Sequence, residues 1–103
     1  MSGTKHDSGK PMITLVRPDF IIGVAEAMTF GAKKYGKYNY QEGLEYSRLL
    51  DAAFRHLLSI ANGVDVDEES GLPHVVLVGS NMNMLYDLMK NNLGTDDRIR
   101  NTT

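Results

Sequence analysis

The segment from Leu49 to Leu88 constrains the fold of this chain more than any other, because it has the pattern of two apolar-faced helices joined by an acidic loop. Apolar residues recur at helical spacing before residue 62 and again after residue 73, whereas residues 64–71 carry four carboxylates and end in a glycine. A chain that reverses over so short a loop packs its two helices side by side and antiparallel. Ionisable groups around such a hairpin are the usual material of a metal-assisted or anion-binding site.

The rest of the chain extends this hairpin to a small all-α domain. Pro18 suits the first turn of a helix, and apolar residues at helical spacing then predict a helix over 18–34. Ser47 is a good N-cap for a second helix over 47–62, and a third helix over 73–90 is apolar almost all round. The 103 residues should form a single domain over 1–103, with a flexible N-terminal arm at 1–11, a brief extended stretch at 12–16 and a frayed tail at 91–103. We expect a homo-oligomer formed through the third helix, because so small a domain buries little apolar surface alone.

Composition excludes several classes of protein. The 11 basic and 13 acidic residues give a net charge of -2, which provides no electrostatic case for a protein that binds duplex nucleic acid, since such a protein needs a basic face. The absence of Cys excludes disulfides and thiolate metal ligands. No apolar stretch is long enough to span a membrane, and the chain does not start like a signal peptide, which predicts a cytoplasmic protein without membrane contact.

The histidines sit where the two hairpin helices should meet. The expected buried stripe of the second helix consists of Leu49, Leu50, Ala53, Phe54, Leu57, Leu58 and Ala61. His56 borders this stripe, where it is either a packed imidazole or a ligand. In an antiparallel pair His56 faces the third helix between His74 and Asn81, which share a face because they are seven residues apart. These three side chains are expected to line one seam, with the acidic loop closing its end.

Two further segments allow a binding interpretation and a purely structural one. The polar cluster at residues 5–10 combines lysines with Ser8 and Gly9, which could meet a phosphate, or it is a solvated terminus. The loop at residues 35–46 carries four tyrosines, and lysines lie beside it. The tyrosine rings could stack a base, or they could cover the hydrophobic core.

Motifs spread over residues 5 to 88 carry a family resemblance. They are Lys5-x-Asp7-Ser8-Gly9-Lys10-Pro11, Thr29-Phe30-Gly31-Ala32-Lys33-Lys34-Tyr35-Gly36, Asn39, Ser47-Arg48-Leu49-Leu50, Arg55-His56-Leu57-Leu58, and Asp65-x-Asp67-x-Glu69-Ser70-Gly71-Leu72-Pro73-His74 with Asn81. In this order and spacing they resemble the N-terminal domain of phage and bacterial dATP/dGTP diphosphohydrolases. That all-helical domain is related in idea to MazG-like nucleotide pyrophosphohydrolases. For a phage-encoded member the compartment would be the host cytoplasm.

The resemblance implies a purine (deoxy)nucleotide-binding protein that hydrolyses nucleoside triphosphates with Mg²⁺ (or Mn²⁺). The candidate catalytic residues are His56, Asp65, Asp67, Glu69 and His74, and the candidate metal ligands are Asp65, Asp67, Glu69 and His74. The candidate nucleotide-binding residues are Lys5, Ser8, Lys10, Lys33, Lys34, Tyr35, Asn39, Tyr40, Arg48, Arg55 and Asn81. In this interpretation the carboxylates position the metal on the phosphates, and the cationic side chains neutralise developing charge.

The chain departs from the family pattern at three positions. Val64 stands where an acid is usual, Leu77 where a second His is usual, and Tyr40 where Trp is usual. The loss of a carboxylate and an imidazole could disable a divalent-metal site. An alternative function is therefore a non-catalytic phage protein that sequesters a nucleotide or a cyclic-nucleotide signal, and a weaker alternative is a small structural assembly protein.

Overall fold

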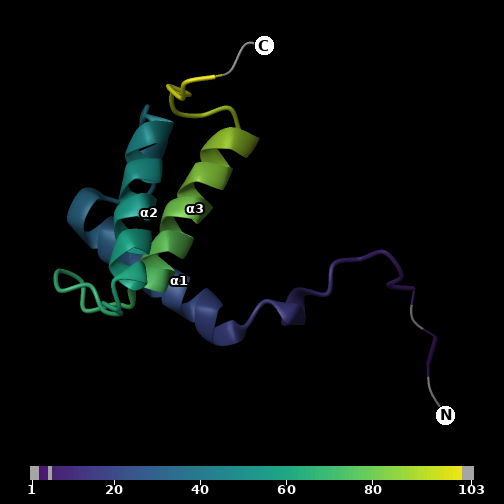
Figure 1. Cartoon of the computed structure of the whole chain (residues 1–103). Helices are drawn as coiled ribbons and strands as arrows, with labels where there is room; N and C mark the ends of the chain where they lie inside the picture. Colours follow the sequence, from purple (N-terminus) through teal and green to yellow (C-terminus); the bar gives the residue numbers. More distant parts are fainter. Residues whose placement is uncertain (1–2, 5, 101–103) are drawn as a thin grey trace.

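The computed structural model describes residues 3–4 and 6–100, which fold into helices joined by loops (Figure 1). The helices are α1 (Pro18–Tyr35), α2 (Tyr46–Ala61) and α3 (His74–Lys90), with single 3₁₀ turns at Ile13–Leu15 and Asn39–Gln41. Within this described part of the chain there is no β-strand, only two isolated bridges in loops. The prediction of an all-α, three-helix domain is confirmed.

The α2–α3 hairpin is the centre of the molecule. The two helices run antiparallel and side by side, while α1 crosses behind them (Figure 1). Tyr46 and Leu49 of α2 pack against Leu85 and Leu88 of α3, and Leu88 is the most deeply buried of these side chains. This cluster lies at the end of the hairpin where α2 begins and α3 ends, so it fixes the register of the two helices.

Helix α1 contacts the hairpin through α3. Ala27 of α1 packs with Val76 and Leu77 of α3, and Leu72 of the acidic loop covers this second cluster. The close approach depends on Gly79, where an added Cβ would lie 2.7 Å from Cγ2 of Val24. A residue with a side chain at this position of α3 would push the two helices apart.

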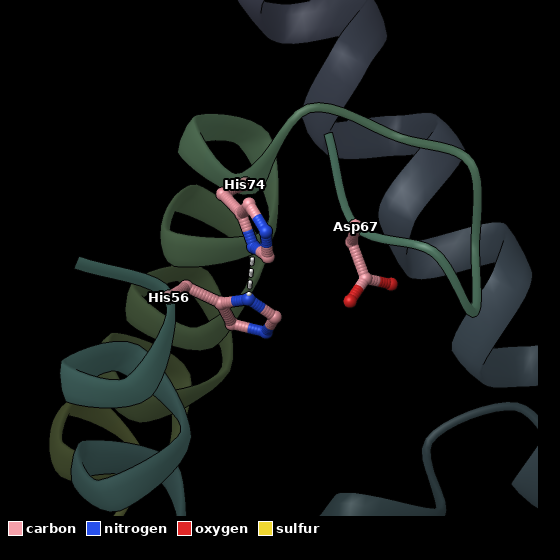
Figure 2. A group of neighbouring side chains, drawn as sticks. All are labelled: His56, Asp67 and His74. Atoms are coloured by element: carbon pink, nitrogen blue, oxygen red, sulfur yellow. Dashed lines mark hydrogen bonds between the residues drawn. The ribbon is translucent and has the colours of Figure 1, made fainter. Parts of the chain in front are cut away.

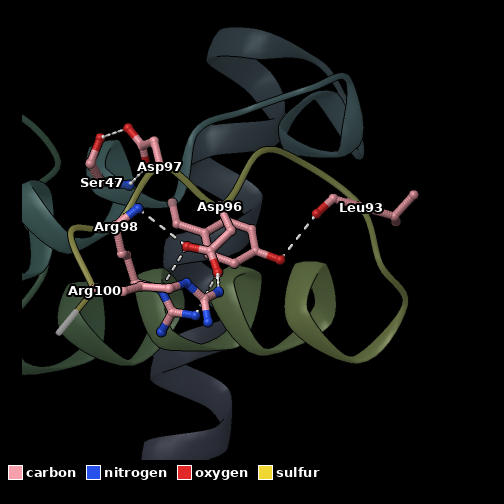
Figure 3. Close-up of polar contacts among 7 residues, drawn as sticks. Ser47, Leu93, Asp96, Asp97, Arg98 and Arg100 are labelled. Carbon is pink, nitrogen blue, oxygen red and sulfur yellow. Dashed lines mark hydrogen bonds and ion pairs between the residues drawn. The ribbon is translucent and has the colours of Figure 1, made fainter. Parts of the chain in front are cut away.

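The segment after α3 is hydrogen-bonded to the start of α2 (Figure 3). The backbone of Thr95 donates to Leu44 and accepts from the Tyr46 amide, with N···O distances of 3.0 and 2.9 Å. Asp97 accepts from both the amide and the hydroxyl of Ser47. The prediction of a frayed tail is therefore corrected for residues 93–97, because long-range contacts hold a segment that lacks a local structural signal.

Three local predictions also need correction. The stretch at 12–16, predicted as extended, contains a 3₁₀ turn at Ile13–Leu15, and it leads away from the helices (Figure 1). Glu45, not Ser47, occupies the N-cap position of α2. The hydroxyl of Ser47 does not accept from a backbone N–H of its own helix as an N-cap would, and it donates instead to the distant Asp97. Four members of the expected α2 stripe are exposed, namely Phe54, Leu57, Leu58 and Ala61. They lie outside the faces of α2 that contact the rest of this single chain.

None of the helices in the described ranges is long and apolar enough to cross a membrane.

Candidate functional site

Two histidines meet where α2 and α3 come together beside the acidic loop (Figure 2). His56 is half-buried in the last third of α2, and His74 is buried as the first residue of α3. Their Nδ1 atoms are 2.8 Å apart, and the ring planes are tilted by 45°. This confirms that antiparallel packing brings His56 to His74. It also means that, when nothing lies between the rings, one Nδ1 carries the hydrogen and donates the hydrogen bond, and the other Nδ1 accepts it.

Asp67 is the carboxylate that the loop brings to this pair. One ligand atom from each of Asp67, His56 and His74 lies within 4.8 Å of the other two (Figure 2). The amide and the hydroxyl of Ser70 both donate to Oδ2 of Asp67, at 2.9 and 2.8 Å. The loop itself is held by backbone hydrogen bonds from Asp67 to Leu72 and from His74 to Asp65. We call His56, Asp67 and His74 the histidine–aspartate cluster.

The surroundings favour one charge state of this cluster. Burial lowers the pKa of His56, and the neighbouring His74 lowers it further. Burial alone would raise the pKa of Asp67, but the two hydrogen bonds from Ser70 and the nearby histidines outweigh it, so this pKa lies below its usual range. At neutral pH the cluster therefore presents a neutral His56 imidazole beside an ionised carboxylate, which is the state that accepts a cation.

A partly open cavity of about 590 Å³ lies on the other half of the hairpin. This volume falls within the roughly 300–1,000 Å³ that is usual for small-molecule pockets. Its lining combines the loop at residues 35–46, which we call the tyrosine loop, with α1, α2 and α3. It includes Met28, Tyr35, Tyr38, Asn39, Tyr40, Glu45, Arg48, Asn81 and Met84. Asn81 is a buried amide, whereas Arg48 is exposed at the mouth. We call this cavity the tyrosine pocket.

The wall of the tyrosine pocket is fixed by a carboxylate of α3. The Tyr40 hydroxyl donates to Oδ2 of Asp87 at 2.6 Å, and the Gln41 amide donates to the same oxygen at 2.8 Å. Burial and this hydrogen bond raise the pKa of Tyr40 to about 12, so the phenol is protonated at neutral pH. The three hydrogen bonds that Asp87 accepts, from Tyr40, Gln41 and Asn91, lower the pKa of its carboxyl. The tyrosine loop is thereby pinned to the hairpin.

The pocket and the cluster lie along the same helix pair. His74 and Asn81 are seven residues apart on one face of α3, about 10 Å along the helix. Arg48 and Arg55 have the same spacing on α2. Because the helices are antiparallel, Arg48 is level with Asn81 at the pocket, and Arg55 is level with His74 at the cluster. The seam that was predicted for His56, His74 and Asn81 is thus divided between two neighbouring sites.

The structure brings together only part of the expected site. Tyr35, Asn39, Tyr40, Arg48 and Asn81 line the tyrosine pocket, and His56, Asp67 and His74 form the cluster. The other expected residues lie elsewhere: Ser8 and Lys10 in the N-terminal arm, Lys33 exposed on α1, Lys34 and Glu69 joined in an ion pair, Asp65 exposed in the loop and Arg55 exposed on α2. Lys5 lies outside the described residues.

Two of the four expected metal ligands are absent from the cluster. Glu69 extends from the loop to Lys34 at the end of α1, and Asp65 contributes only its backbone carbonyl, which accepts from the His74 amide. The alternation of Asp65, Asp67 and Glu69 along the sequence predicted that the three carboxylates would share one side of the loop. The loop is not an extended strand, however, so alternate residues do not share a side.

Sequence reasoning missed the supports of both sites. Ser70 orients Asp67, and the signal for it was local, since a Ser three residues after an Asp often donates back to it. Asp87 and Asp97 carry no such signal, because the loop residue Tyr40 that Asp87 holds and the Ser47 that Asp97 holds are more than 40 residues away along the chain. Tyr38, which lines the pocket, adopts the left-handed conformation with φ of 57°.

The fold and its two sites define a small all-α domain with an aromatic pocket beside a histidine–aspartate cluster. The chain belongs to the family described as "dATP/dGTP diphosphohydrolase, N-terminal", whose model matches residues 1–98. A dATP/dGTP diphosphohydrolase of Salmonella phage PMBT28 is 40% identical to it over 98 residues, which cover 95% of this chain and 33% of the relative. The chain thus spans about a third of the length of the curated relative it matches. No solved structure matches it.

Proposed function

We propose that this chain binds a purine deoxynucleoside triphosphate along the α2–α3 hairpin and hydrolyses it to the monophosphate and pyrophosphate. The observation that carries the proposal is the alignment of the tyrosine pocket and the histidine–aspartate cluster on one helix pair, about 10 Å apart along α3. The family and the name of the phage relative agree with this chemistry. The compartment that we propose for it is the cytoplasm.

The tyrosine pocket takes the nucleoside in this proposal. Its tyrosine rings and methionine side chains offer flat and adaptable apolar contact to a base, as aromatic platforms do. Asn81 offers both a donor and an acceptor within the pocket, and a purine edge carries groups of both kinds. The buried amide, rather than the exposed rings, is therefore the group that discriminates between bases.

The phosphates extend from the pocket toward the cluster. Arg48 lines the pocket and Arg55 lies at the level of His74 on the same helix, so the two arginines are spaced along the proposed path of the triphosphate. In the reaction, a water oxygen bonds to the α-phosphorus, the bond from that phosphorus to the bridging oxygen breaks, pyrophosphate leaves, and the proton that the water loses passes to solvent. The cationic side chains stabilise the charge that develops on the phosphate oxygens.

The expected Mg²⁺ does not fit the residues that the hairpin brings together. Mg²⁺ prefers an octahedral set of oxygens, but the cluster supplies two imidazole nitrogens and one carboxylate, with Asp65 and Glu69 directed elsewhere. We propose that Mg²⁺ (or Mn²⁺) arrives as part of the substrate, bound to its phosphates.

Product analysis tests the proposal. The chain is incubated with dATP, dGTP, dCTP or dTTP and Mg²⁺, and the mixture is separated by chromatography. We expect monophosphate and pyrophosphate from the purine nucleotides and little from the pyrimidines. Asn81→Ala should weaken purine binding about ten-fold, the value of one lost hydrogen bond, whereas Asn83→Ala, on exposed α3 surface, should leave it unchanged. Tight binding without product would favour the sequestering alternative, and no binding would overturn both.

We also infer that two copies of this chain associate through apolar surface of the hairpin. Phe54 and Leu58 of α2 are 61% and 64% exposed, and Val75 and Tyr86 of α3 are 52% and 67% exposed. Apolar side chains this exposed on two packed helices are typical of a protein interface. Light scattering at micromolar concentration should give the mass of a dimer or larger assembly. A monodisperse monomer would contradict this inference and leave the hydrolase proposal intact.

A further inference from the structure

The histidine–aspartate cluster has the geometry of a cation site. Its donor atoms come from three different places in the fold, namely the last third of α2, the acidic loop and the first residue of α3 (Figure 2). One donor atom of each residue lies within 4.8 Å of the others, and the two Nδ1 atoms are 2.8 Å apart. Two nitrogens that each lie about 2.0–2.1 Å from one ion are roughly 3.0–3.4 Å apart, so a small separation of the rings would admit the ion.

The pairing of two Nδ1 atoms is itself informative. A histidine at a functional site usually donates Nδ1–H to a carbonyl or a carboxylate, and this hydrogen bond fixes the tautomer of the ring. Here each histidine presents Nδ1 to the other, and a single proton between them is all that the neutral pair can share. A cation in place of that proton would use both lone pairs. The arrangement is thus complementary to a positive ion that both rings contact.

Asp67 is held ready as the third ligand. Ser70 donates both its amide and its hydroxyl to Oδ2, which fixes the carboxylate and leaves Oδ1 without these donors. The Gly71 amide donates to the Asp67 carbonyl at 2.8 Å, so the backbone at this residue is fixed as well. Such supporting hydrogen bonds orient metal ligands in proteins and strengthen binding.

We propose that His56, His74 and Asp67 form a resident site for a borderline first-row transition cation of the Zn²⁺ class. Imidazole nitrogens suit Zn²⁺ and its neighbours, whereas Mg²⁺ suits oxygens alone. Three protein ligands leave at least one position of a tetrahedral ion for a water or a phosphate oxygen, as catalytic zinc sites do. The site does not depend on a nucleotide, so it can be tested without one.

Calorimetry on the full chain, freed of metal with a chelator and without nucleotide, tests the site. We expect one Zn²⁺ per chain and at least a hundred-fold weaker binding of Mg²⁺, with Mn²⁺ between them. His56→Asn and Asp67→Asn should each weaken Zn²⁺ binding at least ten-fold. The matched controls are His6→Ala in the N-terminal arm and Asp65→Asn in the loop, which should bind as the unaltered chain does. Circular dichroism confirms that each variant is folded.

Co²⁺ absorption adds a measurement that does not depend on a variant folding. Bound Co²⁺ should show the visible bands of a nitrogen- and oxygen-ligated ion, and stoichiometric Zn²⁺ should remove them. The proposal is overturned if Zn²⁺ and Mg²⁺ bind equally, if Zn²⁺ binding survives His56→Asn in a folded chain, or if Asp65→Asn is as damaging as Asp67→Asn. Absence of Zn²⁺ binding up to millimolar concentration would also overturn it. Zn²⁺ binding without nucleotide hydrolysis would leave this site in place and remove the proposed function.

Discussion

Gly79 of α3 and Val24 of α1 are in such close contact that an added Cβ at Gly79 would lie 2.7 Å from Cγ2 of Val24. We expect Gly79→Ala to destabilise the fold by about 1 kcal/mol, because overpacking that costs about 1–3 kcal/mol exceeds the roughly 1 kcal/mol that alanine gains in a helix. Urea unfolding followed by circular dichroism measures the change. Gly31→Ala is the matched control, since a Cβ there meets no atom within 4 Å and should stabilise. Equal stabilisation by both substitutions would show that α1 does not approach α3 in this way.

The segment after α3 can be tested at Gly94, which has a φ of +71° and would place a Cβ 2.6 Å from the carbonyl oxygen of Leu44. Gly94→Ala should cost more than the roughly 1–2 kcal/mol of left-handed backbone, because the neighbouring backbone must also move. Gly63→Ala has a similar φ of +80° with open space around it, so it isolates the backbone cost. Thermal unfolding of the two variants gives the difference. Equal losses would mean that residues 93–97 are not held against the start of α2.

Acid unfolding should depend on Asp87. Its carboxyl accepts hydrogen bonds from Tyr40, Gln41 and Asn91, which lower its pKa in the folded state. A lowered folded pKa contributes stability above the unfolded value of roughly 3.9, and that stability is lost as the pH falls through the folded pKa. Asp87→Asn should therefore be less stable at pH 7 and less sensitive to pH below about 4. Melting temperatures measured over this pH range check both effects, with Asp51→Asn on exposed α2 surface expected to follow the unaltered chain.

Removal of Arg48 should weaken nucleotide binding, whereas removal of an arginine far from the pocket should not. Arg48 lines the mouth of the tyrosine pocket, so Arg48→Ala should weaken dATP binding about ten-fold or more, as expected for a lost charged hydrogen bond. Arg48→Lys should recover part of the loss, because it keeps the charge but not the planar donor pair. Arg17→Ala, at the opposite end of α1 from Tyr35, removes the same charge and should have no effect. Fluorescence titration measures the affinities, and equal losses for Arg17 and Arg48 would place the phosphates outside the pocket mouth.

The sequence was sufficient to predict the three helices and the meeting of His56 with His74. Helical spacing of apolar residues is a local signal, and antiparallel packing then follows from the short acidic loop. The separation of Asp67 from Asp65 and Glu69 was not predictable, because it depends on the hydrogen bonds that Ser70 and Leu72 make within a folded loop. The burial of α2 was overestimated for a related reason. Periodicity places Phe54 and Leu58 on an apolar stripe, but it does not show whether anything covers that stripe.

The hydrogen bonds between Thr95 and residues 44 and 46 have a practical consequence for fluorescence work. They bring the segment after α3 next to Glu45, which lines the tyrosine pocket, while the N-terminal arm leads away from the hairpin (Figure 1). The sequence has no native thiol, so a cysteine introduced at the fully exposed Ile99 would take up a maleimide dye at one position. A dye there would lie four residues beyond the Thr95 contact, so a change in its emission on addition of nucleotide would show that binding reaches the segment after α3, whereas the same dye in the arm would serve as the reference.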